Sequence, residues 1–301
     1  MAKTRNPEFV ASLERGLKVL QTFSREHPQL TLSEVAALTT LTPATARRSL
    51  HTLEKLGYLG RSGRRFMLRP KVLSIGSGYL SAINAEVVLQ PFLQEVANEV
   101  GGSSSVTVLD ELDIVYIAHA SVNRAIRLTA GVGARYPVYP TSMGRVLLAF
   151  QPDAVIDAYF RQVVFQRFTE HTETDERALR RVLSEVRAKG YAAIQDELDY
   201  GIVSVSLPIF APSGRLVAAA NCSDVTNRLD RDTMIKQRLP VLRQAVRRIE
   251  GMLAQYPELT NSVTTMGSDY LRLPAVARVA QPVVARQGRR MKLGSKRASA
   301  Q

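Results

Sequence analysis

The 301-residue chain lacks features on which secreted, metal-binding and membrane proteins depend. Its single cysteine, Cys222, cannot form a disulfide within one chain, which fits a reducing compartment. Its four histidines are scattered and show no metal-ligand spacing. No stretch approaches the roughly 20 apolar residues that a membrane-spanning helix needs. We therefore expect a cytoplasmic protein without a structural disulfide, a metal site or a membrane segment.

Sequence motifs of catalysis are absent as well. The chain contains no G-x-S-x-G motif and no P-loop, and none of its histidines belongs to a nucleophile motif. Cys222 lies in the apolar segment LVAAANCS, where a cysteine is usually an inert core residue. The first residues, MAKTRNPEFV, are basic but lack the apolar run of a secretory signal. These absences favour a binding protein over an enzyme, and no cofactor is expected.

Positive charge is concentrated at the two ends of the chain. Residues 1–85 contain 13 basic and 5 acidic side chains, a net charge of +8, and residues 260–301 contain 8 and 1, a net charge of +7. The intervening residues 86–259 have a net charge of −2. Because attraction to phosphates supplies much of the affinity for DNA, the N-terminal excess predicts a DNA-binding unit. The C-terminal run has no apolar period, which is typical of disordered chain.

The segment from residue 30 to residue 70 has the pattern of a winged helix-turn-helix. Thr31 and Glu34 match a capping box, which satisfies two free N–H groups at the start of a first helix. Residues 39–41 follow as the turn. An earlier helix over residues 12–25 is expected to complete the small core through apolar residues at helical spacing, namely Leu13, Leu17, Leu20 and Phe23.

The second helix of the motif is expected to read DNA. Thr42 serves as its N-cap, Pro43 occupies the first helical position, and Gly57 ends the helix. Its inward face is predicted to consist of Ala46, Leu50, Leu53 and Leu56. In a helix-turn-helix, the N-terminal part of the second helix reaches base edges in the major groove. The candidate DNA contacts therefore lie on the face opposite the core, and they are Thr42, Ala44, Thr45, Arg47, Arg48 and His51.

A basic hairpin is predicted after this helix. Residues 58–59 and 65–68 have the composition of two short strands, and Ser62-Gly63 is a hairpin-type turn between them. Three arginines are expected to project from this wing toward phosphates or the minor groove, namely Arg61, Arg64 and Arg65. The next stretch, residues 70–83, is predicted as an apolar linker helix that suits a dimer contact.

Residues 86–257 predict a second domain of the α+β class with a largely antiparallel sheet. Helices are expected at residues 86–100, 141–150, 153–160, 175–189 and 231–255. Strands are expected at residues 105–109, 114–119, 125–129, 191–195, 203–210 and 215–223. A Gly/Pro-rich loop is expected over residues 131–140.

Polar residues of this domain suggest a site for a small polar ligand. Thr141, Ser142 and Met143 begin a helix, and the free N–H groups of a helix start attract anions. Ser204 and Ser206 share one face of a predicted strand, and Asn221 and Ser223 share one face of the next. Ordinary capping and a solvent-facing sheet edge are the alternative explanation.

The segments, taken in order, resemble the IclR family of bacterial transcriptional regulators. The resemblance covers about residues 8–257 and rests on SLERGLKVL, LTLSEVAALTTLTPATARRSLHTLEKLGYL, RRFMLRPKVLSIG, SSSVTVLDELDIVYIA, YPTSMGRVLLA, GYAAIQDELDYGIVSVSLPIF and AAANCS. It is similar in particular to the branch that controls catabolism of aromatic acids through the β-ketoadipate pathway, the protocatechuate and 4-hydroxybenzoate regulators.

The resemblance implies a dimer or a dimer of dimers, each chain carrying a winged helix-turn-helix and a GAF-like effector domain. It also implies that a small carboxylate or aromatic acid binds between the helix start and the sheet. The effector residues carried over by motif are Leu128, Tyr136, Ser142, Met143, Ser204, Asn221 and Ser223. Asn221 replaces a hydroxyl residue of many relatives, and Ile194-Gln195 replaces acidic residues of some, which leaves the identity of the ligand open.

We therefore expect a transcriptional regulator that binds an operator in double-stranded DNA and responds to a small carboxylate. The expected organisation is a DNA-binding domain at 8–69, a linker helix at 70–85, an effector domain at 86–257 and a basic tail at 258–301. A regulator of another carboxylate pathway, an enzyme with an appended DNA-binding unit and a ligand-independent DNA-binding protein are the alternatives. The operator and the choice between activation and repression stay open.

Overall fold

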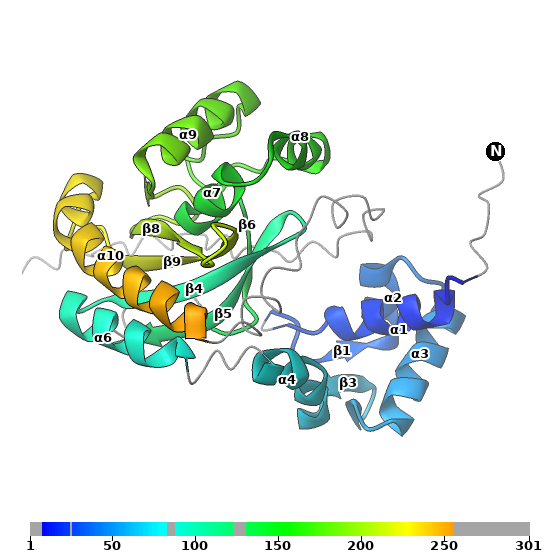
Figure 1. The fold of residues 1–301 in the computed structure, drawn as a ribbon. Coiled ribbons are helices and arrows are strands. Elements are labelled where there is room, and N and C mark those ends of the chain that lie inside the picture. Colours follow the sequence, from blue (N-terminus) through cyan, green and yellow to red (C-terminus); the bar gives the residue numbers. More distant parts are fainter. Residues whose placement is uncertain (1–7, 25, 83–87, 123–130, 256–301) are drawn as a thin grey trace, which may run out of the picture. The chain divides into compact units, whose positions relative to one another are not determined.

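The computed structural model describes residues 8–24, 26–82, 88–122 and 131–255. These residues divide into two compact units, of which the first ends at Val72 and the second begins at Leu73 (Figure 1). The strand predicted at 125–129 and the basic tail lie outside the described residues. In the described ranges, no helix is long and apolar enough to cross a membrane.

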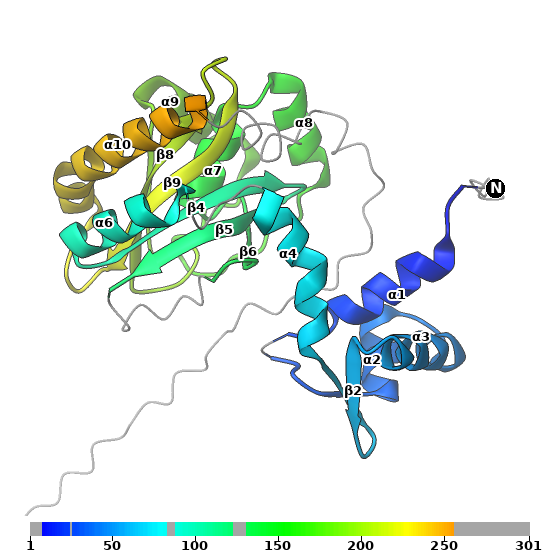
Figure 2. The ribbon, with the colours of Figure 1, turned by 60° about the horizontal axis from the view of Figure 1, so that its bottom comes forward.

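The first unit packs helices against a small antiparallel sheet (Figure 2). The sheet has the strand order β1-β3-β2, so the predicted hairpin of β2 and β3 is joined by a strand that the sequence did not suggest. The elements are α1 (Ala11–Gln21), β1 (Leu30–Thr31), α2 (Leu32–Thr39), α3 (Pro43–Lys55), β2 (Leu59–Ser62) and β3 (Arg65–Leu68).

The predicted helix boundaries of the helix-turn-helix are confirmed by their caps. The Thr31 hydroxyl accepts from the Glu34 N–H, and the Glu34 carboxylate accepts from the Thr31 N–H, which completes the capping box. The Thr42 hydroxyl likewise accepts from the backbone N–H of Thr45. At the end of α3, Gly57 has a φ of +81°, a conformation that glycine adopts without steric cost.

The core of this unit corrects two sequence expectations. Leu50 is fully buried, but Leu56 is 51% exposed because it caps α3 beyond the last helical turn. Leu20 and Phe23 pack in the core as predicted, but Leu13 and Leu17 are 62% and 46% exposed, so that half of the predicted inward face was wrong. Val19, about 200° around the helix from Leu17, is the residue that α1 buries.

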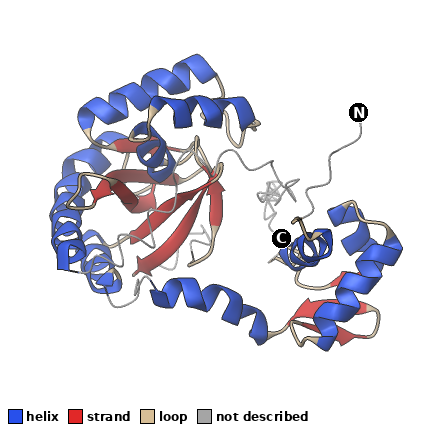
Figure 3. Cartoon of the chain, turned by 45° about the vertical axis from the view of Figure 1, so that its right-hand side comes forward, coloured by secondary structure: helices blue, strands red, loops and turns tan. Residues whose placement is uncertain are grey.

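The second unit is a six-stranded antiparallel sheet with helices on both faces (Figures 1 and 3). Its strand order is β6-β5-β4-β9-β8-β7. Its strands are β4 (Ser103–Asp110), β5 (Asp113–Ser121), β6 (Arg135–Pro137), β7 (Ala192–Gln195), β8 (Ile202–Phe210) and β9 (Leu216–Val225). Its helices are α4 (Leu73–Ala82), α6 (Gln90–Val100), α7 (Ser142–Ala149), α8 (Asp153–Gln162), α9 (Glu176–Lys189) and α10 (Arg231–Gln255).

The antiparallel α+β class predicted for this unit is confirmed, with local corrections. The stretch predicted as a Gly/Pro-rich loop contains β6, which pairs with β5 at the edge of the sheet. The predicted linker helix begins with a 3-10 turn, Pro70–Val72, and becomes α-helical only at Leu73.

Alternation along the strands sorts the side chains into two layers. Val203, Val205 and Cys222 face α6 and α10, and their neighbours Ser204 and Asn221 face the side that α7 covers. Burial raises the pKa of the Cys222 thiol to about 12. The thiol is therefore protonated at neutral pH, which agrees with the expectation of an inert core cysteine.

Replacing Leu50 by alanine tests the assignment of the first core. Since Leu50 is fully buried, Leu50→Ala is expected to lower the free energy of unfolding of the full-length chain by about 2–5 kcal/mol. Leu56→Ala is the matched control and should cost well under half as much. Urea unfolding followed by circular dichroism measures both, and equal losses would contradict the burial difference.

Candidate functional site

The exposed face of α3 carries cationic side chains without partners. Arg47 and Arg48 are exposed, and neither guanidinium group forms a hydrogen bond or ion pair within the described ranges. His51, one turn further, lies 3.5 Å from the Glu54 carboxylate. Free guanidinium groups on a solvent-facing helix are available for base edges and phosphates.

The start of α3 adds small polar groups to this face. The hydroxyl of Thr42 donates to that of Thr45 at 2.9 Å, and Thr45 is half-buried. Ala44 is exposed beside them. The structure thus places all of the candidate contacts of this helix on one accessible surface, apart from the partly covered Thr45.

The three arginines of the wing differ in their surroundings. Arg61 donates to the Gly63 carbonyl at 2.8 Å, and its guanidinium lies 5.5 Å from the centre of the Phe66 ring. Arg65 donates to the Gln29 carbonyl at 3.2 Å and lies 3.5 Å from the Glu34 carboxylate. Arg64 is exposed and has no partner among the residues described. All three side chains are exposed, and Arg61 and Arg65 also form contacts within the first unit.

Serine hydroxyls from α7 and β8 meet in the interior of the second unit. The Ser142 hydroxyl lies 2.8 Å from that of Ser204 and 2.6 Å from that of Ser206. All three side chains are at most 4% exposed. The structure therefore brings together the helix start and the strand face on which the sequence placed the polar ligand.

Asn221 extends this cluster onto the neighbouring strand β9. Its amide nitrogen donates to the hydroxyls of Ser204 and Ser223, at 3.2 and 2.8 Å. The side-chain amide oxygen of Asn221, Oδ1, is buried and accepts no hydrogen bond from the residues that the structure describes. An unpaired buried acceptor costs about 1–3 kcal/mol of stability.

The start of α7 presents backbone donors to the same region. Thr141 caps the helix by accepting from the Gly144 N–H at 3.1 Å. The N–H groups of Ser142 and Met143 precede the first intrahelical bond and have no acceptor within the described ranges. Both residues are 2% exposed, so the positive end of the helix dipole lies in a buried, low-dielectric place.

A glycine in the first turn allows this close packing of α7. A Cβ atom on Gly144 would lie 2.2 Å from the Val138 carbonyl oxygen. Backbone atoms cannot move aside as a flexible side chain can, so any other residue would push the helix away from the preceding segment.

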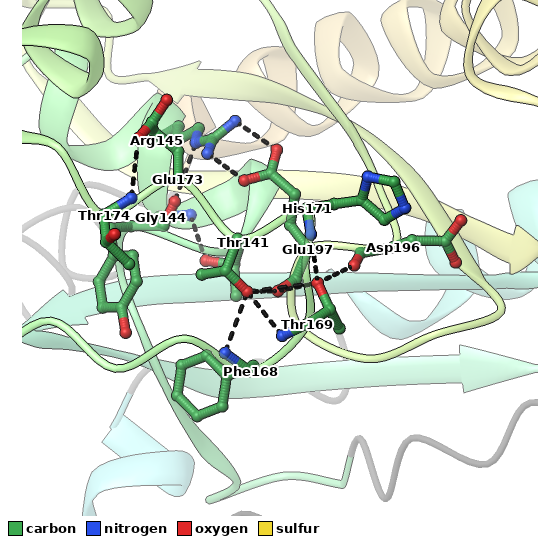
Figure 4. A network of polar contacts seen from close by, with 12 residues as sticks. Thr141, Gly144, Arg145, Phe168, Thr169, His171, Glu173, Thr174, Asp196 and Glu197 are labelled. Carbon is green, nitrogen blue, oxygen red and sulfur yellow. Dashed lines mark hydrogen bonds and ion pairs between the residues drawn. The ribbon is translucent and has the colours of Figure 1, made fainter.

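A buried ion pair fixes α7 to the segment that follows β7 (Figure 4). Both terminal nitrogens of the Arg145 guanidinium face the Glu197 carboxylate, and its Nε donates to the Tyr139 carbonyl at 2.9 Å. Thr172 holds the other end, since its hydroxyl donates to the Glu197 carbonyl at 2.7 Å. The sequence reasoning did not find this pair, which joins residues 52 positions apart.

The remaining effector candidates lie beside the cluster or outside the described residues. Met143 accepts from the Thr107 hydroxyl at 3.3 Å, and Tyr136 packs edge to face on Tyr116, with ring centres 5.8 Å apart. Leu128 lies outside the described residues.

Sequence reasoning missed Ser105 and His119, whose side chains hydrogen-bond on the same sheet face. Hydroxyl residues at alternate positions in the segment SSSVT were the signal that could have found Ser105.

Together these features define a class of protein. One unit is a winged helix-turn-helix with an unpaired basic face, and the other encloses hydroxyl, amide and helix-start N–H groups under a sheet. This combination is that of a DNA-binding regulator with a separate ligand-binding domain.

Comparison with known proteins identifies the family. Residues 12–63 match the model of the IclR helix-turn-helix domain, and residues 77–251 match that of the bacterial transcriptional regulator IclR C-terminal domain. The chain belongs to the IclR family of bacterial transcriptional regulators. It is therefore a DNA-binding transcriptional regulator, and the expectation that it is not an enzyme is confirmed.

Several family members are similar over most of their length. The Pca regulon regulatory protein of Pseudomonas putida is 37% identical over 247 residues, which cover 82% of this chain and 85% of that protein. The p-hydroxybenzoate hydroxylase transcriptional activator of Acinetobacter baylyi is 31% identical, with coverages of 83% and 94%. The crystal structure of a protein described as a transcriptional regulator from Rhodococcus sp. RHA1 has a TM-score of 0.71 at 42% identity, with coverages of 82% and 99%.

The Arg145–Glu197 pair generates a stability prediction. Arg145→Ala or Glu197→Ala leaves a buried charge without its partner, which should lower the free energy of unfolding by about 3–5 kcal/mol. The double variant Arg145→Ala/Glu197→Ala should cost clearly less than the sum of the two single variants. Denaturant unfolding of all four proteins gives the coupling energy, and strict additivity would mean that the pair carries no interaction energy.

Proposed function

We propose that this regulator binds the carboxylate of a small acid at the start of α7 and thereby changes its affinity for an operator. The buried convergence of Ser142, Ser204, Asn221 and Ser223 supports this proposal most directly. Carboxylate oxygens accept hydrogen bonds only, and the free N–H groups of Ser142 and Met143 supply donors there. Tyr136, and Leu128 by family resemblance, would form the apolar wall.

We further propose that the acid is aromatic. One relative that is 31% identical is an activator for p-hydroxybenzoate hydroxylase, a name that points to a hydroxylated benzoate. The rings of Tyr116 and Tyr136 supply an aromatic surface beside the polar cluster. A regulator of another carboxylate pathway is the second candidate, which the substitution of Asn221 for a hydroxyl residue favours.

The proposed DNA contacts divide into two groups by their surroundings. Arg47 and Arg48 are free to reach base edges, with Thr42, Ala44, Thr45 and His51 beside them. Arg64 is free to neutralise a phosphate, and Arg61 and Arg65 contribute charge from fixed positions. Free guanidinium groups at the helix and the wing would thus give both base recognition and salt-dependent affinity.

We propose that the chain acts in the cytoplasm as a homodimer or a dimer of dimers. The helix α4 exposes Leu73, Ile75 and Tyr79 by 71%, 54% and 40%, an apolar surface that a second copy of the chain would cover. Paired DNA-binding units also match a two-fold operator. A regulator of this kind has one conformation that binds the operator tightly and one that binds it weakly. The acid changes the operator affinity only by as much as the acid's own affinity differs between these two conformations.

A thermal-shift titration tests the proposed ligand class. Purified protein is titrated with 4-hydroxybenzoate, protocatechuate, β-ketoadipate and short-chain acids, because a molecule that binds only the folded state raises its unfolding midpoint. A saturable rise with a ring acid is expected, and it should shrink in Asn221→Ala. A rise with an aliphatic acid alone would contradict the aromatic assignment and favour the second candidate.

The recognition helix gives a separate prediction for DNA binding. Arg47→Ala should weaken operator binding by roughly tenfold or more and weaken non-specific binding much less, since a base contact carries about 1–3 kcal/mol of discrimination. Arg243→Ala, an exposed arginine of the second unit, is the control. Fluorescence anisotropy on operator and scrambled duplexes measures both, and equal losses on the two would reduce Arg47 to a phosphate contact.

A further inference from the structure

Three side chains form a row across the sheet, beginning at the proposed carboxylate site. Ser105 of β4 pairs in register with Asn221 of β9 on one side and with His119 of β5 on the other. Residues paired in register point to the same face of a sheet, so all three face the layer that holds Ser142. Val106, the next residue of β4, lies in the core on the opposite face.

The far end of this row is a second polar group. The Ser105 hydroxyl lies 2.9 Å from Nδ1 of His119, and His119 is half-buried. The other ring nitrogen, Nε2, has no partner among the residues that the structure describes. Adjacent strands lie about 4.8 Å apart, so His119 is two strand spacings, roughly 10 Å, from Asn221.

The surface between the two ends suits a flat apolar group. The central strand carries only short hydroxyl side chains there, those of Ser105 and Thr107, and the Thr107 hydroxyl is satisfied by the Met143 sulfur. Tyr116 pairs in register with Thr107 and stacks edge to face on Tyr136. A benzene ring over Ser105 would lie beside Met143 and this aromatic wall, with one substituent toward α7 and the opposite one toward His119.

We infer that Ser105 and His119 recognise a hydroxyl group on the ring of the bound acid, opposite its carboxylate. This inference rests on the proposed function, and it narrows the ligand class to benzoates hydroxylated at that position. A phenolic hydroxyl both donates and accepts, so it matches Nε2 of His119 in either neutral tautomer. Non-hydroxylated benzoates and aliphatic diacids leave this nitrogen without a partner.

The protonation state of His119 supports the same assignment. Burial lowers the pKa of His119 below its ordinary value, so the imidazole is neutral at neutral pH. Asp110 and Asp113, the acidic residues at the β4–β5 turn, face Arg135 rather than His119. A neutral ring favours a phenol over a second carboxylate as the group bound at this end.

Isothermal titration calorimetry on the full-length protein tests the inference with two ligands, 4-hydroxybenzoate and benzoate. The wild-type protein should bind 4-hydroxybenzoate more tightly by roughly tenfold or more, the value of about one hydrogen bond to a buried group. His119→Ala should bring this ratio close to one, with the affinity for benzoate nearly unchanged. Ser105→Ala should lower the ratio partly, and His171→Ala, at an exposed histidine, should leave it as it is.

The outcomes separate this inference from the proposed function. If His119→Ala keeps the wild-type preference for 4-hydroxybenzoate over benzoate, the inference is overturned and the proposed function stands. The same holds if His119→Ala loses affinity for both ligands equally and His119→Gln does not restore it. If His119→Ala fails to fold, His119→Gln and Ser105→Ala decide by the same ratio. Wild-type protein that binds neither ring acid would overturn the proposed ligand class together with this inference.

Discussion

The second unit depends on how closely the start of α7 is seated on the polar face of the sheet. Gly144 allows backbone contact at the first turn, and the buried Arg145–Glu197 pair holds the next turn in place. These two constraints bring the Ser142 hydroxyl within 2.8 Å of that of Ser204 and keep the start of α7, with its two unpaired N–H groups, buried. Preorganised donors in a buried place bind an anion strongly, because their alignment costs nothing when the ligand arrives.

The first unit achieves its orientation of side chains by local means. Caps at Thr31 and Thr42 set where the two helices begin, and the left-handed Gly57 sets where the second one ends. Once Leu50 and Leu53 are buried, the opposite face of α3 must present Arg47 and Arg48 to solvent. Arg61 and Arg65 hydrogen-bond to backbone carbonyls of the first unit, so the same residues stabilise the wing and give it positive charge.

What could be predicted from the sequence follows from how local each interaction is. The caps depend on neighbours within a turn, and the burial of Leu50 follows the helical period of apolar residues; both were predicted correctly. The convergence of Ser204 and Asn221 also followed, since strand alternation sets which face a residue takes. Leu56, Leu13 and Leu17 were misassigned, because periodicity does not show where a helix stops touching its core.

The features that the sequence did not reveal depend on contacts between distant segments. The Arg145–Glu197 pair and the Ser105–His119 pair arise from sheet register and helix placement, which no short window contains. The strands β1 and β6 are too short to have a period of their own and exist because a neighbouring strand pairs with them. Nonlocal pairing therefore determined much of the candidate site.

The most direct test of the central claim is a crystal structure of the protein with bound 4-hydroxybenzoate. The account predicts that the carboxylate accepts hydrogen bonds from the N–H groups of Ser142 and Met143, with the ring over β4. The described residues also form a hollow of about 430 Å³ at the sheet edge, lined in part by His171, Asp196 and Arg231. An acid bound in that hollow, with the start of α7 unoccupied by it, would contradict the account.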